Sequence, residues 1–348
     1  MVRRLGQDAT SHKGEGFVKV VLRPRLMEAT FNNIMRMISG KKFYGDDCPM
    51  QDVEEAEAFR EIIEEMQILI SAENKADFLP IFRWLYDFEG INKRMKKVAG
   101  GAEAFLEKLI QEHRGGKHGS ADNMISHLLK LSESQPEYYT DQIIKGLIQA
   151  MLVAGTETSA LAVEWIMTEL LNAPVLLQKA KDEIDTHIGR DRLVEEEDMS
   201  KLPYLRNIIN ETFRLHPTAA LSLPHESSED CNIGGYHIPR GTIVLTNISL
   251  IHRDPKIWSN PLSFKPERFE KEGEENKLIT FGLGRRACAG QVLGQRLVTY
   301  TVALLIQCFQ WKRESEEKLD MAIGKGLVMT KLIPLQAMCK SLPIVNKI

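Results

Sequence analysis

A ten-residue segment, Phe281–Gly290 with the sequence FGLGRRACAG, constrains this chain more than any other part of it. At average residue frequencies, its five fixed positions arise by chance in a chain of 348 residues on the order of once in ten thousand. An apolar helical pattern over Val292–Phe309 follows directly, so the segment predicts a tight loop that ends at a helix. The pattern is Phe-x-x-Gly-x-Arg-x-Cys-x-Gly, carried by Phe281, Gly284, Arg286, Cys288 and Gly290.

The residue types around Cys288 suit a thiolate that binds haem iron. Positive charge and a helix N-terminus favour a deprotonated thiol, and Arg286 and the following helix supply both. Gly284 and Gly290 let the backbone turn tightly, and Phe281 can exclude water from the sulfur. A thiolate ligand donates electron density that favours O–O cleavage. The alternative is an ordinary reduced thiol, as we expect for the four scattered cysteines that form no disulfide framework or zinc pattern, Cys48, Cys231, Cys308 and Cys339.

Three further segments match motifs of the cytochromes P450, in the order of that family. Glu211-Thr-Phe-Arg214 has the Glu-x-x-Arg spacing and is followed by Pro266-Glu-Arg268-Phe269, while Ala154–Ser159 (AGTETS) lies inside a long helical pattern. Read alone, the first is a solvated surface pair and the last a polar stripe on an exposed helix face. Together with the Cys288 loop, they make the chain resemble a cytochrome P450 from about Val18 to the C-terminus. Longer passages, such as Lys201–Pro217, resemble plant isoflavone hydroxylases.

The resemblance implies roles for particular residues. The cofactor is expected to be haem b (iron protoporphyrin IX), with Cys288 as its iron ligand and Arg286 and His225 at its propionates. Thr158 would hydrogen-bond the oxygen ligand, and Glu157 would relay protons to it. The buried structural network would comprise Glu211, Arg214 and Arg268, and the substrate contacts would be Gly155, Leu221, Leu223 and Leu327.

The implied activity is that of a monooxygenase. It would insert one atom of O₂ into a C–H bond of a small apolar or aromatic substrate, with an isoflavonoid as the leading hypothesis. Electrons would come from NADPH through NADPH–cytochrome P450 reductase, because the chain has no convincing dinucleotide fingerprint of its own. Two rivals remain: a haem-thiolate isomerase or dehydratase, and an inactive truncated remnant that at most binds haem or a partner. An intact Glu157–Thr158 pair argues against the first.

The expected fold is mainly α with a small β portion, a single cytochrome P450 domain over 1–348 that lacks its N-terminal part. The N-terminal anchor, the N-terminal β-sheet and the Trp-x-x-x-Arg helix are expected to be missing, since no tryptophan precedes Trp84. Full-length family members are held at the cytosolic face of the endoplasmic reticulum membrane, but the apolar stretch Gly146–Ala154 is too short to span a bilayer. A net charge of −3 does not suggest nucleic acid as a partner.

Hydrophobic periodicity predicts most of the helices. Gly40 should end the first of them, and Gly100–Gly101 should weaken the third. A Gly-rich polar loop is expected over His113–Asn123. The turn signal Gly234–Gly235 and the β-rich run Gly241–Asn247 predict a hairpin. The helical patterns cover Val18–Ser39, Asp52–Ser71, Ile91–His113, Asp141–Leu171, Pro174–Ile188, Leu202–Leu215 and Val292–Phe309.

Overall fold

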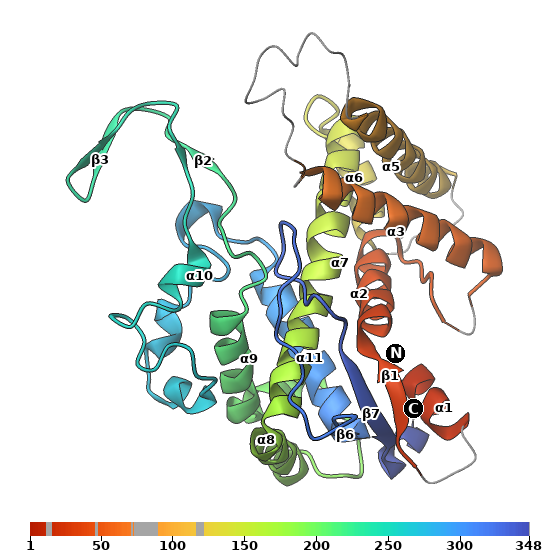
Figure 1. The fold of residues 1–348 in the computed structure, drawn as a ribbon. Coiled ribbons are helices and arrows are strands. Elements are labelled where there is room, and N and C mark those ends of the chain that lie inside the picture. Colours follow the sequence, from red (N-terminus) through yellow and green to blue (C-terminus); the bar gives the residue numbers. More distant parts are fainter. Residues whose placement is uncertain (12–15, 46–47, 71, 73–89, 116–121, 348) are drawn as a thin grey trace. The chain divides into compact units, whose positions relative to one another are not determined.

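A computed structural model describes residues 1–11, 16–45, 48–70, 72, 90–115 and 122–347, and its elements are drawn in Figure 1. Helices dominate and strands are short, as the sequence predicts for a mainly α protein with a small β portion. The chain separates into two units, and each has its own core. Unit 1 comprises Arg23–Ala160, and unit 2 comprises Val2–Leu22 together with Leu161–Ile348.

Unit 1 is helical and is built around aromatic side chains. Phe59 and Phe105 stack with ring centroids 4.0 Å apart, and Phe31 meets Phe43 edge-on. Such pairs contribute beyond the apolar area they bury. The helices are α2 (Leu22–Ser39), α3 (Met50–Ile70), α5 (Ile91–Arg114), α6 (Met124–Ser134) and the first part of α7 (Asp141–Asn172).

Two glycines of unit 1 behave differently from one another. Gly40 ends α2 at a φ of 73°, as expected, and its N–H donates to the Arg36 carbonyl at 2.9 Å. Gly101, in contrast, does not interrupt α5. A Cβ at this position would lie 2.7 Å from Ile62 Cδ1, so the missing side chain lets α3 and α5 approach closely. The predicted weak point is therefore a packing contact.

Helix α6 was not predicted from the sequence. It begins after Asn123, whose Oδ1 accepts the Ser126 N–H at 2.9 Å and caps the helix. The polar loop expected over His113–Asn123 lies partly outside the described residues.

Unit 2 holds the remainder of α7 and most of the other helices. Its largest fully buried side chains include Trp165 and Trp258. Prolines at the first helical position start α8 and α9, where the missing N–H costs nothing. The helices are α1 (Val2–Ser11), α8 (Pro174–His187), α9 (Pro203–Leu215), α10 (Ile248–Ile251) and α11 (Gln291–Cys308).

The helix predicted to begin at Val18 begins only at Leu22, because Val18–Val21 forms strand β1. This strand pairs antiparallel with β7 (Gln336–Ser341), which also pairs with β6 (Phe309–Lys312). The β-branched valines suit a pleated strand, and pairing with a segment more than 300 residues away decides the outcome. Phe309, predicted to end a helix, opens β6 because it pairs with Ser341 of β7.

The predicted hairpin consists of β3 (Cys231–Ile233) and β4 (Tyr236–Ile238). Gly234 and Gly235 between them have φ of 57° and 87°, the left-handed conformation that a two-residue turn of this kind requires. The next strand, β5 (Ile243–Val244), does not join this hairpin. It pairs with β2 (His225–Glu226).

Candidate functional site

The loop from Phe281 to Gly290 is closed by its own backbone. The Cys288 N–H donates to the Phe281 carbonyl at 2.8 Å, and the Ala287 N–H donates to the Gly284 carbonyl at 3.1 Å. Gly284 has a φ of 75°, which favours glycine, as the sequence predicted. These bonds fold the loop back on itself and leave the Cys288 thiol exposed immediately before α11.

Gly290 does not play the backbone role expected of it. Its φ is −88°, which any residue adopts, and it is the N-cap of α11. A Cβ there would lie 3.8 Å from Cys288 Sγ, so the glycine keeps the space beside the sulfur open. The second left-handed glycine of the loop is instead Gly282, with a φ of 72°.

Two cationic features lie in the Cys288 loop or next to it. The N-terminal end of α11 follows Cys288 directly, and the partial positive charge of a helix N-terminus stabilises an anion. Arg286 is exposed, and no carboxylate pairs with it among the described residues. The loop therefore presents a cysteine and an arginine that are both available to a ligand.

The root of the loop is attached to helix α9. Thr280 Oγ1 donates to the Phe213 carbonyl at 3.1 Å. The Phe281 ring meets the Phe213 ring edge-on, with centroids 5.2 Å apart. Phe281 thus packs on α9, and its carbonyl holds Cys288.

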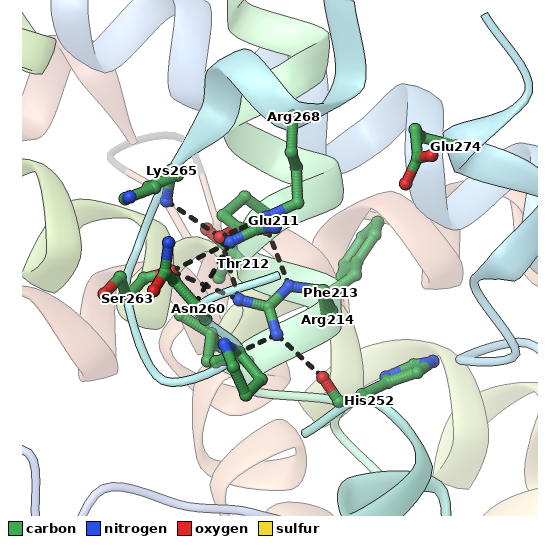
Figure 2. Close-up of polar contacts among 12 residues, drawn as sticks. Glu211, Thr212, Phe213, Arg214, His252, Asn260, Ser263, Lys265, Arg268 and Glu274 are labelled. Atoms are coloured by element: carbon green, nitrogen blue, oxygen red, sulfur yellow. Dashed lines mark hydrogen bonds and ion pairs between the residues drawn. The ribbon is translucent and has the colours of Figure 1, made fainter. Parts of the chain in front are cut away.

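Glu211, Arg214 and Arg268 come together as one buried cluster, which Figure 2 shows. Arg214 binds both carboxylate oxygens of Glu211, through Nε at 2.8 Å and Nη2 at 2.9 Å. Arg268 Nε lies 2.9 Å and 3.0 Å from the same two oxygens, and the Lys265 N–H donates to Glu211 Oε1 at 2.8 Å. Glu211 and Arg214 are fully buried, so the surface pair considered from sequence is excluded.

The same cluster organises the surrounding backbone. Arg214 Nη1 donates to the carbonyls of His252 and Pro261, both at 2.7 Å, and Nη2 donates to the Ser263 carbonyl at 3.2 Å. Arg268 Nη1 donates to the Ser259 carbonyl at 3.0 Å. Buried charges are tolerated when they are paired and their remaining donors are used, and both conditions hold here.

Helix α7 carries the Ala154–Ser159 segment in unit 1. A Cβ on Gly155 would lie 2.9 Å from Ile34 Cδ1, so α2 passes close to the helix at this glycine. Thr158 Oγ1 donates to the Ala154 carbonyl at 2.6 Å. Its hydroxyl proton is therefore engaged by its own helix, while the oxygen can still accept a hydrogen bond.

A small cavity of about 20 Å³ lies beside this segment within unit 1. Thr156 and Glu157 line it from α7, and Arg60 and Glu64 line it from α3. The Thr156 hydroxyl is buried and has no hydrogen-bond partner among the described residues. Burial raises the pKa of Tyr44, another lining residue, to about 12, so its phenol stays neutral.

The remaining predicted residues lie on exposed segments of unit 2. His225 is in β2, opposite Val244 of β5. Leu221, Leu223 and Leu327 are each about half exposed or more. The Met329 N–H donates to the Thr218 carbonyl at 2.8 Å, which ties the turn that carries Leu327 to the segment that carries the other two. The two segments that carry these leucines are thus joined at Thr218 and Met329.

A family description of cytochrome P450 matches residues 1–336. The chain belongs to the cytochromes P450. It is 62% identical to isoflavone 3'-hydroxylase of Medicago truncatula and 55% identical to isoflavone 2'-hydroxylase of Glycyrrhiza echinata, over all of this chain and 69% and 68% of those proteins. The solved structure of a zebrafish cytochrome P450 with abiraterone superimposes with a TM-score of 0.78 at 24% identity, over 98% of this chain and 76% of that one, and has the same fold.

Cytochromes P450 are haem-thiolate monooxygenases that use O₂, a small-molecule substrate and a redox partner, and this chain is one of them. The residues of the Cys288 loop fit haem b. The thiol is exposed, the space beside Sγ is kept free at Gly290, and Arg286 has no competing carboxylate among the described residues. A thiolate and a guanidinium are the groups that an iron and a propionate take up.

The sequence missed three features of this cytochrome P450 site. Trp165 Nε1 donates to the Met329 carbonyl at 2.7 Å, and His216 stacks on the same indole with centroids 4.2 Å apart. Gly282 supplies a left-handed turn, and His252 contacts the root of the haem loop. Of these residues, only Trp165 could have been noticed in the sequence. It is a large aromatic residue in the apolar C-terminal part of the helical pattern Asp141–Leu171, whose centre is polar.

Plant cytochromes P450 are as a rule membrane-bound. In the described part of the chain, α7 is the one helix long and apolar enough to cross a membrane, and 44% of its most apolar window is buried inside the protein. The core helix of a soluble protein passes the same test.

Proposed function

We propose that this cytochrome P450 hydroxylates an aromatic ring of an isoflavonoid. The 62% identity to isoflavone 3'-hydroxylase over the whole chain carries the proposal. A second isoflavone hydroxylase follows at 55%, so the substrate class is supported by more than one relative. The exposed leucines of two segments joined at Thr218 and Met329 suit an apolar ligand; they are Leu221, Leu223 and Leu327. The fourth proposed substrate contact, Gly155, has Ile34 of α2 against its side-chain position within unit 1.

We assign Cys288 as the thiolate ligand, because its loop presents an exposed thiol at the start of α11. When bound, the haem supplies the oxidising chemistry that dioxygen and two electrons generate. Arg286 and His225 would pair with its propionates, and neither has a carboxylate partner among the described residues. Phe281 and Gly284 shape the loop, and Gly290 leaves room for the sulfur.

The proposed proton path involves two residues of α7. Thr158 keeps an acceptor oxygen because its own proton is donated to the Ala154 carbonyl, so it can accept a hydrogen bond from a proton-bearing partner. Glu157 lies beside it and lines the small cavity with Thr156, which suits a carboxylate that takes protons from solvent and returns them.

Electrons are proposed to come from NADPH through NADPH–cytochrome P450 reductase, at the cytosolic face of the endoplasmic reticulum membrane. Membership of a plant branch of the family supports both points. Fractionation of plant cells that express the tagged protein tests the location. Recovery with endoplasmic reticulum membranes supports it, and recovery with another compartment contradicts it.

The activity is tested by incubating the purified protein, loaded with haem, with the reductase, NADPH and a panel of isoflavones. The expected product is larger than the substrate by one oxygen atom, and fragmentation in the mass spectrometer locates the new hydroxyl. Reactions without the reductase or without NADPH are the controls. Haem-loaded protein that accepts electrons but oxidises no isoflavone would contradict the substrate class.

A further inference from the structure

His252 lies immediately after α10 and is completely buried. Its Nε2 is 3.0 Å from the backbone nitrogen of Ile279. Its own carbonyl accepts Arg214 Nη1 at 2.7 Å. His252 thus joins the cluster around Glu211 to the backbone segment that leads into the Cys288 loop.

Ile279 is the point from which that loop departs. Its carbonyl accepts the Gly282 N–H at 2.9 Å, which forms the first turn of the loop. The next residues, Thr280 and Phe281, contact Phe213 of α9. The Phe281 carbonyl then accepts the Cys288 N–H at 2.8 Å. A chain of short contacts therefore runs from the His252 ring to the backbone of the cysteine.

The geometry determines the protonation state of the ring. A backbone N–H only donates, so Nε2 of His252 must accept, and the proton of the neutral ring is on Nδ1. Burial lowers the pKa of His252 to about 4. A hydrogen bond with the Arg214 backbone opposes this shift, and the charges of Arg214 and Arg253 add to it. The ring is therefore neutral at physiological pH.

The charged groups near His252 are cationic or already paired. Arg214 reaches it from α9, and Arg253 follows it in the chain and donates to carbonyls of Leu215 and Ser249. The His252 ring meets the Trp258 indole edge-on. Lys277 Nζ, which pairs with Glu274, lies 5.6 Å from the centroid of that indole. Arg268 also lies over that indole and pairs with Glu211. A proton on Nε2 would remove the bond to Ile279 and add a cation to this group.

We propose that His252 is a positioning residue for the haem loop. Its neutral ring accepts a hydrogen bond from the Ile279 N–H and thereby fixes the direction in which the Phe281–Cys288 loop extends from Ile279. The contact acts through Ile279 and reaches no ligand directly. Replacement by an apolar residue would leave the half-buried Ile279 N–H without its acceptor, so the root of the loop would loosen before the rest of unit 2.

Hydrogen exchange at the Ile279 amide tests the proposal in the purified chain and needs no turnover, so its result is independent of the proposed activity. In His252→Leu the Ile279 amide should exchange about tenfold faster relative to α9 amides, equivalent to the roughly 1.4 kcal/mol of one hydrogen bond. In His252→Gln, whose Oε1 can accept at the same place, much of the protection should return.

His216 provides the matched control. It is also buried in unit 2, stacks on Trp165 and places Nε2 2.7 Å from Glu169 Oε1, and within the described residues no hydrogen bond or ring contact joins its side chain to Ile279 or the loop. His216→Leu should leave Ile279 protected relative to α9. Equal Ile279 exchange in His252→Leu and the unsubstituted chain would overturn the proposal. So would loss of protection in His252→Gln that matches His252→Leu, because His252 would then act by packing alone.

The ring itself offers a test that needs no substitution. Long-range ¹H–¹⁵N spectra should show His252 neutral with its proton on Nδ1 at pH 7. Ile279 protection should persist at pH 5 and be lost as the pH falls through about 4. A proton on Nε2 at pH 7, or loss of protection near pH 6.5, would contradict the assignment.

Discussion

The polar side chains of α9 and those in the middle of α7 both occupy helix faces that would ordinarily be apolar, but they differ in how their atoms are satisfied. Both carboxylate oxygens of Glu211 receive hydrogen bonds, and Arg214 uses its donors on Glu211 and three carbonyls. The Thr156 hydroxyl, in contrast, is buried beside a small cavity without a partner among the described residues. A saturated cluster fixes a fold, whereas an unsaturated one leaves polar atoms available to solvent or a ligand.

The largest effect on stability is expected at the saturated cluster. Arg214→Leu removes one of the two guanidinium partners of a fully buried carboxylate and three further hydrogen bonds to carbonyls. We expect it to lower the free energy of unfolding by about 3–5 kcal/mol, measured by urea denaturation. Arg296→Leu, which breaks an exposed pair with Glu196, is the control and should change it by less than about 1 kcal/mol. Similar losses in both variants would show that the α9 cluster is no more than a surface network.

Acid should weaken the region around the cluster through His252. An unfolded chain binds a proton at this histidine near pH 6.5, whereas the native chain binds it only near pH 4. Between these values the unfolded state holds more protons, so stability rises with pH up to about 6.5. It falls by up to about 3 kcal/mol as the pH drops to 4.

Denaturation at several pH values in this window measures that slope, and His252→Gln should flatten it. The titration of other groups is common to both proteins, so their difference isolates His252. The assignment fails if the slope is the same in the variant.

Much of the Cys288 loop and of the α9 cluster could be predicted, because their positions are local motifs with fixed spacing. Phe281, Gly284 and Cys288 lie within eight residues, and Glu211 and Arg214 are one helical turn apart. Strand β1 could not be predicted, because it depends on pairing with β7 at the other end of the chain. His252 was missed because its contact is with a backbone N–H, which leaves no trace in side-chain patterns.

Disrupting the proposed proton relay in α7 should change how tightly NADPH consumption is coupled to product formation, and should leave folding unchanged. Thr158→Ala removes a hydroxyl that bonds only to Ala154 of its own helix among the described residues. We expect the haem spectrum to be retained and the yield of product per NADPH consumed to fall by about tenfold or more. Product and NADPH measured in the same reaction give this ratio. Normal coupling in the variant would show that Thr158 takes no part.

The smallest effect is expected at Thr156. Thr156→Val replaces a buried hydroxyl that has no partner among the described residues by a methyl of similar size. We expect the free energy of unfolding to change by less than about 1 kcal/mol, or to rise, because no hydrogen bond within the protein is lost. Thermal denaturation of the variant measures this, and a loss comparable to that of Arg214→Leu would remove the contrast between the two helices.

The assignment of Cys288 is tested most directly by the spectrum of the reduced protein with carbon monoxide. A thiolate-ligated haem gives a strongly red-shifted Soret band, which the protein should show and Cys288→Ser should lose. Cys231→Ser, at a half-buried cysteine in β3, should keep it. A red-shifted band that survives in Cys288→Ser, or its absence from the unsubstituted protein loaded with haem, would contradict the account.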